Sequence, residues 1–158
     1  NYMNRLGLKI INLIFSLIPL IVGGLLYLGY RSYDLLMFRW GESIGLSKIV
    51  SLWRNVCSQY TLPKWIINAF PDGLWLLSYM LFIDFIWDNH NERKIWLYVL
   101  PTIAIVSELM QLWFPKLGTF DIMDLVCYLS AIFLLEIKQI ICFIHSNLLS
   151  IHFEKMSR

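Results

Sequence analysis

Two long apolar segments are joined by residues 107–125, which read SELMQLWFPKLGTFDIMDL. Glu108 and Gln111 stand near the end of the first segment, and Asp121 and Asp124 open the second. A carboxylate inside or at the edge of a membrane span is costly, so it usually persists only with a partner or a function. This stretch therefore indicates a helical membrane protein whose polar residues gather in one place.

The composition places the chain among integral membrane proteins. Of its 158 residues, 58% are hydrophobic and 15% are charged, and the mean hydropathy is +0.62. A soluble domain of this size would need far more polar surface. The net charge of +2 is too small to imply nucleic acid as a partner. The cysteines match no zinc pattern and no disulfide framework, so we expect Cys127 and Cys142 to act as small apolar side chains.

Four apolar segments predict an all-α fold: an integral membrane four-helix bundle, formed by one transmembrane domain over residues 1–158. The expected spans are residues 8–30, 71–87, 95–114 and 122–144. The first is too long for the core of a signal peptide, so we expect an uncleaved helix. A short charged loop over 88–94 separates the second span from the third. The C-terminal tail, 145–158, is expected to continue as a surface helix.

A further helix is predicted over residues 44–60, between the first and second spans. Its apolar residues recur at helical spacing, and polar residues occupy the opposite face. The apolar positions are Leu46, Ile49, Val50, Trp53, Cys57 and Tyr60. Such an amphipathic helix can lie in the membrane interface with Trp53 as its anchor, or it can pack on the bundle or on a partner. The sequence leaves both arrangements open.

The basic residues give a weak indication of orientation. With four spans, seven of the 13 Lys and Arg residues lie on the side of the N-terminus and six on the other. This excess favours a cytoplasmic N-terminus in the inner (cytoplasmic) membrane. The same topology places the end of the third span and the starts of the second and fourth on one side. The polar residues at these three places can therefore meet.

These converging polar residues form the candidate site. Clustered carboxylates can act as general acid and base, or hold a divalent cation that binds phosphate, although the sequence identifies no metal-ligand motif and no cofactor. Each residue can also serve the fold alone, as a helix cap, a first-turn acid or a hydrogen-bonded tie. No histidine lies nearby in sequence, so a histidine-based hydrolase is not expected. The candidate catalytic residues are Glu108, Gln111, Asp121 and Asp124, and the candidate binding residues are Asp72, Trp75 and Lys116.

Two further carboxylates, Asp84 and Glu136, lie towards the other membrane side. Lys138 and Gln139 follow Glu136 closely in the sequence. We interpret these residues as belonging to the membrane interface. Because no continuous polar stripe crosses the apolar segments, a transporter with a charged pathway is not indicated.

The segment from Ser107 to Gln111, followed by Pro115, Gly118 and Asp121-Ile122-Met123-Asp124-Leu125, resembles the VanZ-like family of small membrane proteins. That family has E-x-x-Q near the end of one span and an acidic pair at the start of the next. The resemblance covers about residues 70–135. The chain departs from the family in two places. The family often has His and an aromatic in the span that corresponds to Asp72–Tyr79, where this chain has Pro71-Asp72-Gly73-Leu74-Trp75. After the second acid the family tends to have Asn and then Gly, where this chain has Cys127, Tyr128 and Ser130-Ala131.

The resemblance implies a bacterial membrane protein with a site near the cell envelope, without specifying a reaction. The family's namesake is associated with glycopeptide-antibiotic resistance. Two functions are open. In the first, the carboxylate-rich site binds or acts on a lipid or an envelope component. In the second, the chain is a non-catalytic oligomeric membrane subunit that anchors or senses for a soluble partner, for example in an anti-phage or envelope-stress complex. A pore is less favoured, because the polar residues cluster at one side.

Overall fold

The computed structural model describes residues 2–32, 36–43, 45–87 and 92–156, and within these ranges the fold is all-α without strands, as predicted. Residues 88–91 of the predicted charged loop lie outside the described ranges. The predicted tail extends the last helix as far as Met156. The long helices are α1 (Tyr2–Tyr30), α5 (Phe70–Ile86), α6 (Arg93–Gln111) and α7 (Ile122–Met156). The short elements are α2 (Leu36–Ser43), α3 (Ser47–Cys57), α4 (Lys64–Asn68) and the 3₁₀ turn η1 (Pro115–Leu117).

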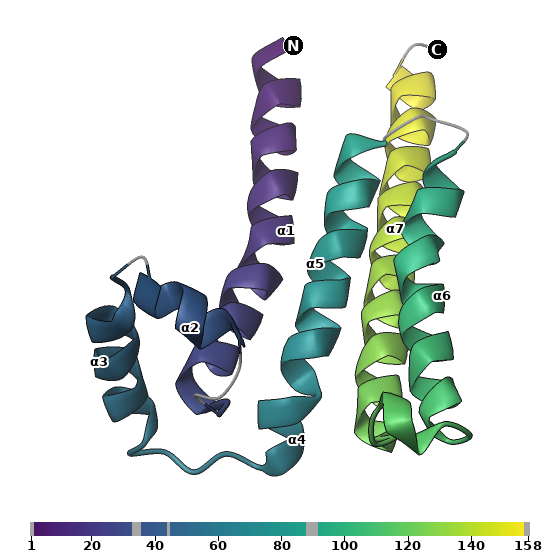
Figure 1. Cartoon of the computed structure of the whole chain (residues 1–158). Helices are drawn as coiled ribbons and strands as arrows, with labels where there is room; N and C mark the ends of the chain where they lie inside the picture. Colours follow the sequence, from purple (N-terminus) through teal and green to yellow (C-terminus); the bar gives the residue numbers. More distant parts are fainter. Residues whose placement is uncertain (1, 33–35, 44, 88–91, 157–158) are drawn as a thin grey trace.

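The long helices run alternately up and down, and α5 is the central one (Figure 1). It contacts α1 on one side and both α6 and α7 on the other. The start of α1, the end of α5, the start of α6 and the end of α7 lie at one end of the bundle. The α2–α3 pair, α4 and η1 lie at the other end. The end of α6 and the starts of α5 and α7 therefore share one end of the molecule.

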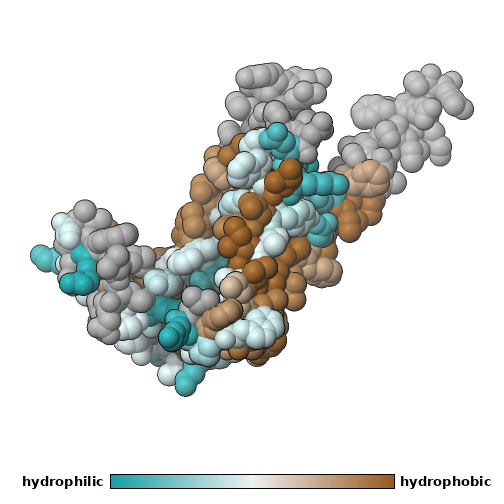
Figure 2. All heavy atoms as spheres, turned by 45° about the vertical axis from the view of Figure 1, so that its right-hand side comes forward, coloured by the Kyte–Doolittle hydropathy of each residue, from teal (hydrophilic) through white to brown (hydrophobic). Residues whose placement is uncertain are grey.

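The outer surface of the bundle is apolar. In Figure 2, brown residues cover much of the visible face. On α7 the side chains of Val126, Leu129 and Phe133 are 50%, 56% and 66% exposed, whereas Ala131 and Leu135 are buried in the core. An exposed apolar surface of this extent is typical of a face that meets a membrane or another protein.

Two helices are long and apolar enough to cross a membrane, over Ile11–Tyr30 in α1 and Ile122–Ile144 in α7. Only 17% of each apolar window is buried inside the structure. The core helix of a soluble protein would be mostly buried, so these windows fit lipid contact better than a soluble core.

Glycine allows α5 to approach its neighbours closely. A Cβ atom on Gly73 would lie 2.7 Å from the Cβ of Cys127 on α7, and one on Gly23 of α1 would lie 2.8 Å from Trp75 Nε1. A buried hydrogen bond of 2.6 Å, from Ser78 Oγ to the Ser16 carbonyl, adds a polar link between α1 and α5. Small residues at helix contacts are typical of membrane bundles.

The amphipathic segment predicted before α4 includes α3, which packs on the end of α1. Trp53 Nε1 donates to the Leu25 carbonyl at 2.8 Å, and Cys57 is buried against Gly29. The rest of the predicted apolar face is not covered, since Ile49 remains 65% exposed. Trp53 and Cys57 therefore hold α3 against α1, while Ile49 points away from the bundle.

Candidate functional site

Glu108 joins the end of α6 to the start of α7. The side chain is only 4% exposed. Its Oε1 accepts a hydrogen bond from the backbone N–H of Asp121 at 2.7 Å, and its Oε2 accepts one from Gln111 Nε2 at 3.1 Å. The three-residue spacing places Glu108 and Gln111 on one helix face, as the sequence predicts. The buried carboxylate is therefore held by two donors.

The turn between these helices depends on Gly118. Its φ of +152° lies in a region that other residues rarely adopt, and a Cβ atom there would be 2.8 Å from Gln111 Oε1. Asp121 then caps α7, since its Oδ1 accepts the N–H of Met123 at 2.9 Å. Glycine thus lets the loop fold back against Gln111 and bring Asp121 to Glu108.

Asp72 and Asp124 complete an acidic cluster with Glu108. Asp72 stands in the first turn of α5 and Asp124 in the first turn of α7. Glu108 acts electrostatically on both carboxylates, and so does the cation of Arg31. The structure therefore brings together carboxylates from the three helices α5, α6 and α7.

Arg31 is a member of this site that the sequence analysis did not single out. It follows the last residue of α1, and its Nη2 donates to the Asn68 carbonyl at 3.2 Å. Its guanidinium lies over the ring of Tyr27, 5.4 Å from the centroid. The available signal was topological, because Arg31 is the first cation after a span that ends on the acidic side.

Trp75 lies next to this group. Its ring centroid is 5.2 Å from that of Tyr27, so Tyr27 is in ring contact with Trp75 and in cation contact with Arg31. Within the described ranges, three buried side-chain polar atoms have no hydrogen-bond partner: Arg31 Nε, Trp75 Nε1 and Asp124 Oδ1. All three belong to the end of the bundle that carries the acidic cluster.

An apolar cavity of about 170 Å³ adjoins the acidic cluster. Gly73, directly after Asp72, and Cys127, one turn after Asp124, both line it. The charges of Asp72 and Asp124 act on the Cys127 thiol, so the cavity and the cluster are neighbours. The polar surface of the acidic cluster is thus adjacent to the apolar surface of the cavity.

Among the described residues, Lys116 enters none of the contacts of this cluster. Lys116 is an exposed residue of η1 and makes no hydrogen bond or ion pair within the described part of the chain. Among the described residues, no group of three or more His, Cys, Asp or Glu side chains is arranged to hold a metal ion. The oxygens of Glu108 are instead occupied by N–H donors.

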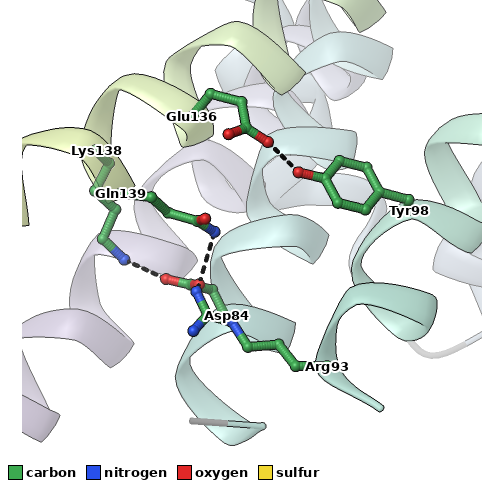
Figure 3. A network of polar contacts seen from close by, with 6 residues as sticks. All are labelled: Asp84, Arg93, Tyr98, Glu136, Lys138 and Gln139. Atoms are coloured by element: carbon green, nitrogen blue, oxygen red, sulfur yellow. Dashed lines mark hydrogen bonds and ion pairs between the residues drawn. The ribbon is translucent and has the colours of Figure 1, made fainter. Parts of the chain in front are cut away.

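A second polar group, drawn in Figure 3, includes Asp84 near the end of α5, whereas Asp72 stands at the start of the same helix. Asp84 of α5 pairs with Arg93 of α6 and with Lys138 Nζ of α7 at 2.8 Å, and it accepts from Gln139 Nε2 at 3.1 Å. Tyr98 of α6 donates to Glu136 of α7. The sequence analysis assigned Asp84 and Glu136 to the membrane interface. The structure adds that each carboxylate has partners on other helices: Arg93, Lys138 and Gln139 for Asp84, and Tyr98 for Glu136.

The chain matches no protein-family model, and it has no significant similarity to a curated protein or to a solved structure.

Proposed function

We propose that the chain is a four-span protein of the bacterial inner membrane, with a cytoplasmic N-terminus, that binds or acts on a lipid or an envelope component. The site comprises Glu108, Gln111, Asp121 and Asp124, with Asp72 and Trp75 from α5. Arg31 joins them on electrostatic grounds. Spans α5 and α6 complete the membrane domain beside α1 and α7. The proposal includes membership of the VanZ-like family, on the resemblance of residues 70–135.

The observation that carries the proposal is the coincidence of unpartnered polar atoms with the acidic cluster. Buried polar groups in native proteins nearly always have a hydrogen-bond partner, so each exception calls for an explanation. Here two donors, Arg31 Nε and Trp75 Nε1, and one acceptor, Asp124 Oδ1, lie at the same end of the bundle. A ligand with an anionic group and a hydroxyl or amine group would supply all three partners.

The neighbouring apolar cavity favours an amphipathic ligand. A cavity lined by Leu77, Val126 and Leu134 suits an acyl or prenyl chain better than a polar solute. The polar part of such a molecule would face Asp72 and Asp124 while its chain remained in the apolar cavity. A lipid or a lipid-linked envelope component has this division of polarity.

The test is native mass spectrometry of the protein purified in a gentle detergent, with bound lipids retained. We expect the wild type to retain a specific lipid or envelope component that Asp124→Asn reduces by on the order of tenfold, the loss of one charged hydrogen bond to the unpartnered Asp124 Oδ1. Glu108→Gln should also reduce this retention, because it removes a negative charge that acts on Asp72 and Asp124. Glu92→Gln is the matched control, since Glu92 is exposed at the other end of the bundle. Equal retention by Glu108→Gln and wild type would refute the site.

The second candidate is a non-catalytic oligomeric subunit that serves a soluble partner. It is favoured by the outward apolar side chains of α3, where Ile49, Leu52 and Val56 are 65%, 68% and 49% exposed at helical spacing. This function predicts a homo-oligomer or a co-purifying soluble protein in the same spectra, together with tolerance of Glu108→Gln. A monomer that carries a specific lipid would contradict it.

A further inference from the structure

The Asp84 network lines an open cavity of about 570 Å³, within the range of roughly 300–1,000 Å³ typical of small-ligand sites. Its polar wall holds Asp84, Arg93, Glu136 and Lys138. Its apolar wall holds Phe85, Ile140 and Phe143. This cavity is therefore amphipathic, and it lies at the end of the bundle opposite the acidic cluster.

The four charged side chains of the cavity, Asp84, Arg93, Glu136 and Lys138, sum to no net charge. Arg93 and Lys138 both pair with Asp84, so the three together carry one net positive charge. The side chains of Arg93 and Lys138 remain 29% and 32% exposed, whereas that of Asp84 is 10% exposed. The two cations therefore keep donors available to an incoming anion, while the anion between them is mostly covered.

Glu136 supplies the complementary negative charge. One of its oxygens accepts the Tyr98 hydroxyl proton, and the other has no donor among the residues that the structure describes. A hydrogen bond from a phenol leaves the carboxylate free to accept from a primary ammonium group. The cavity thus offers cationic donors and an anionic acceptor on one wall.

The depth of this cavity in the membrane suits a lipid headgroup, provided that the four-span arrangement proposed above holds. At about 1.5 Å per residue, the segment of α7 from Asp124 to Lys138 is roughly 21 Å long. Because the hydrocarbon core of a bilayer is about 30 Å thick, two polar clusters at this separation can approach opposite headgroup layers. The apolar wall would then continue towards the acyl chains.

We propose that this cavity binds the headgroup of a zwitterionic phospholipid with a primary amine, of the phosphatidylethanolamine class. The phosphate would accept from Arg93 and Lys138, and the ammonium would donate to Glu136. A choline headgroup lacks the ammonium protons for this last bond, and a glycerol headgroup lacks the positive charge. Selectivity would therefore depend on Glu136, and general affinity for phospholipids on Lys138.

The experiment is native mass spectrometry of the full chain in mixed micelles that contain equal amounts of phosphatidylethanolamine, phosphatidylcholine and phosphatidylglycerol with matched acyl chains. We expect the wild type to prefer phosphatidylethanolamine over phosphatidylcholine by on the order of tenfold, the value of one charged hydrogen bond. Glu136→Gln should abolish this preference while still accepting from Tyr98. Lys138→Gln should weaken the binding of all three lipids, and Glu92→Gln should match the wild type.

Three results would overturn the proposal. The first is a wild type without preference, and the second is a preference that survives in Glu136→Gln. The third is binding of free phosphoethanolamine as strong as that of the lipid, which would assign the cavity to a soluble ligand. Glu108→Gln should keep the preference for phosphatidylethanolamine, so a failure of the acidic site and a failure of this cavity are separable in one set of spectra.

Discussion

Replacing Glu108 with alanine removes an acceptor that two donors share. The change leaves the Asp121 N–H and Gln111 Nε2 without their partner, and each unpaired buried donor costs about 1–3 kcal/mol. Gln111 is half-buried and can turn towards water, so we expect a total loss of about 2–4 kcal/mol in the free energy of unfolding. The start of α7 would lose its tie to α6.

Glutamine at position 108 separates this structural role from the role of the charge. Its carbonyl can still accept from Asp121, and the Gln111 amide can rotate to present its oxygen. The weaker neutral hydrogen bonds are offset by the lower cost of burying an uncharged group, so Glu108→Gln should stay within about 1 kcal/mol of the wild type. Glu108→Gln thus tests function and Glu108→Ala tests stability.

The assay is thermal unfolding in detergent, followed by the fraction of protein that remains monodisperse. For a chain of this length, 1 kcal/mol shifts the unfolding temperature by about 2–4 °C. Glu108→Ala should therefore unfold roughly 5–15 °C below the wild type, and Glu108→Gln within about 4 °C of it. The exposed Glu92→Ala controls for loss of a surface carboxylate. An unchanged unfolding temperature in Glu108→Ala would refute the hydrogen-bonding role.

Two more predictions concern the packing and lipid contact of α7. Gly73→Ala should cost about 1–3 kcal/mol of stability, because the new Cβ would lie 2.7 Å from that of Cys127. Gly24→Ala is the control and should cost nothing, because a Cβ there would have no atom within 4 Å. Equal thermal stability of the two variants would contradict the contact between Gly73 and Cys127. Phe133 is 66% exposed in the apolar window of α7, so Phe133→Glu should cost about 3 kcal/mol in membrane insertion and Phe133→Leu almost nothing. Full insertion of Phe133→Glu, measured by membrane fractionation, would show that this face does not meet lipid.

The sequence predicts the helical class and the acidic cluster well, for two physical reasons. Apolar segments long enough to span a bilayer leave few alternatives to helices, since backbone groups in lipid must pair internally. The alternating direction of consecutive long helices then determines which ends meet, so Asp72 can be expected near Glu108 and Asp124. The helix cap at Asp121 follows from local chemistry alone, because a short polar side chain before an apolar run is a typical helix start.

The site residues that the sequence does not reveal are those whose contacts depend on the direction in which their side chains point. Arg31 reaches the acidic site because α1 and α5 pack through Gly23, and no local pattern encodes that contact. The Asp84 network needs the rotation of three helices about their axes, since Arg93 and Lys138 converge on one carboxylate. Helix rotation depends on the packing of side chains from different helices, which a hydropathy pattern does not specify.

The length of α5 explains why both polar clusters sit within the bundle. Its 17 residues span about 26 Å, less than a hydrocarbon core of about 30 Å, and Asp72 and Asp84 stand near its two ends. As the central helix, α5 has neighbours on both sides, so its ends can meet protein side chains where an outer helix would meet headgroups. On the four-span proposal, α1 and α7 are long enough to cross the bilayer, and the shorter α5 carries Asp72 and Asp84 near its two ends. A ligand of either cluster would then enter at the headgroup level, which favours lipids over soluble molecules at both ends.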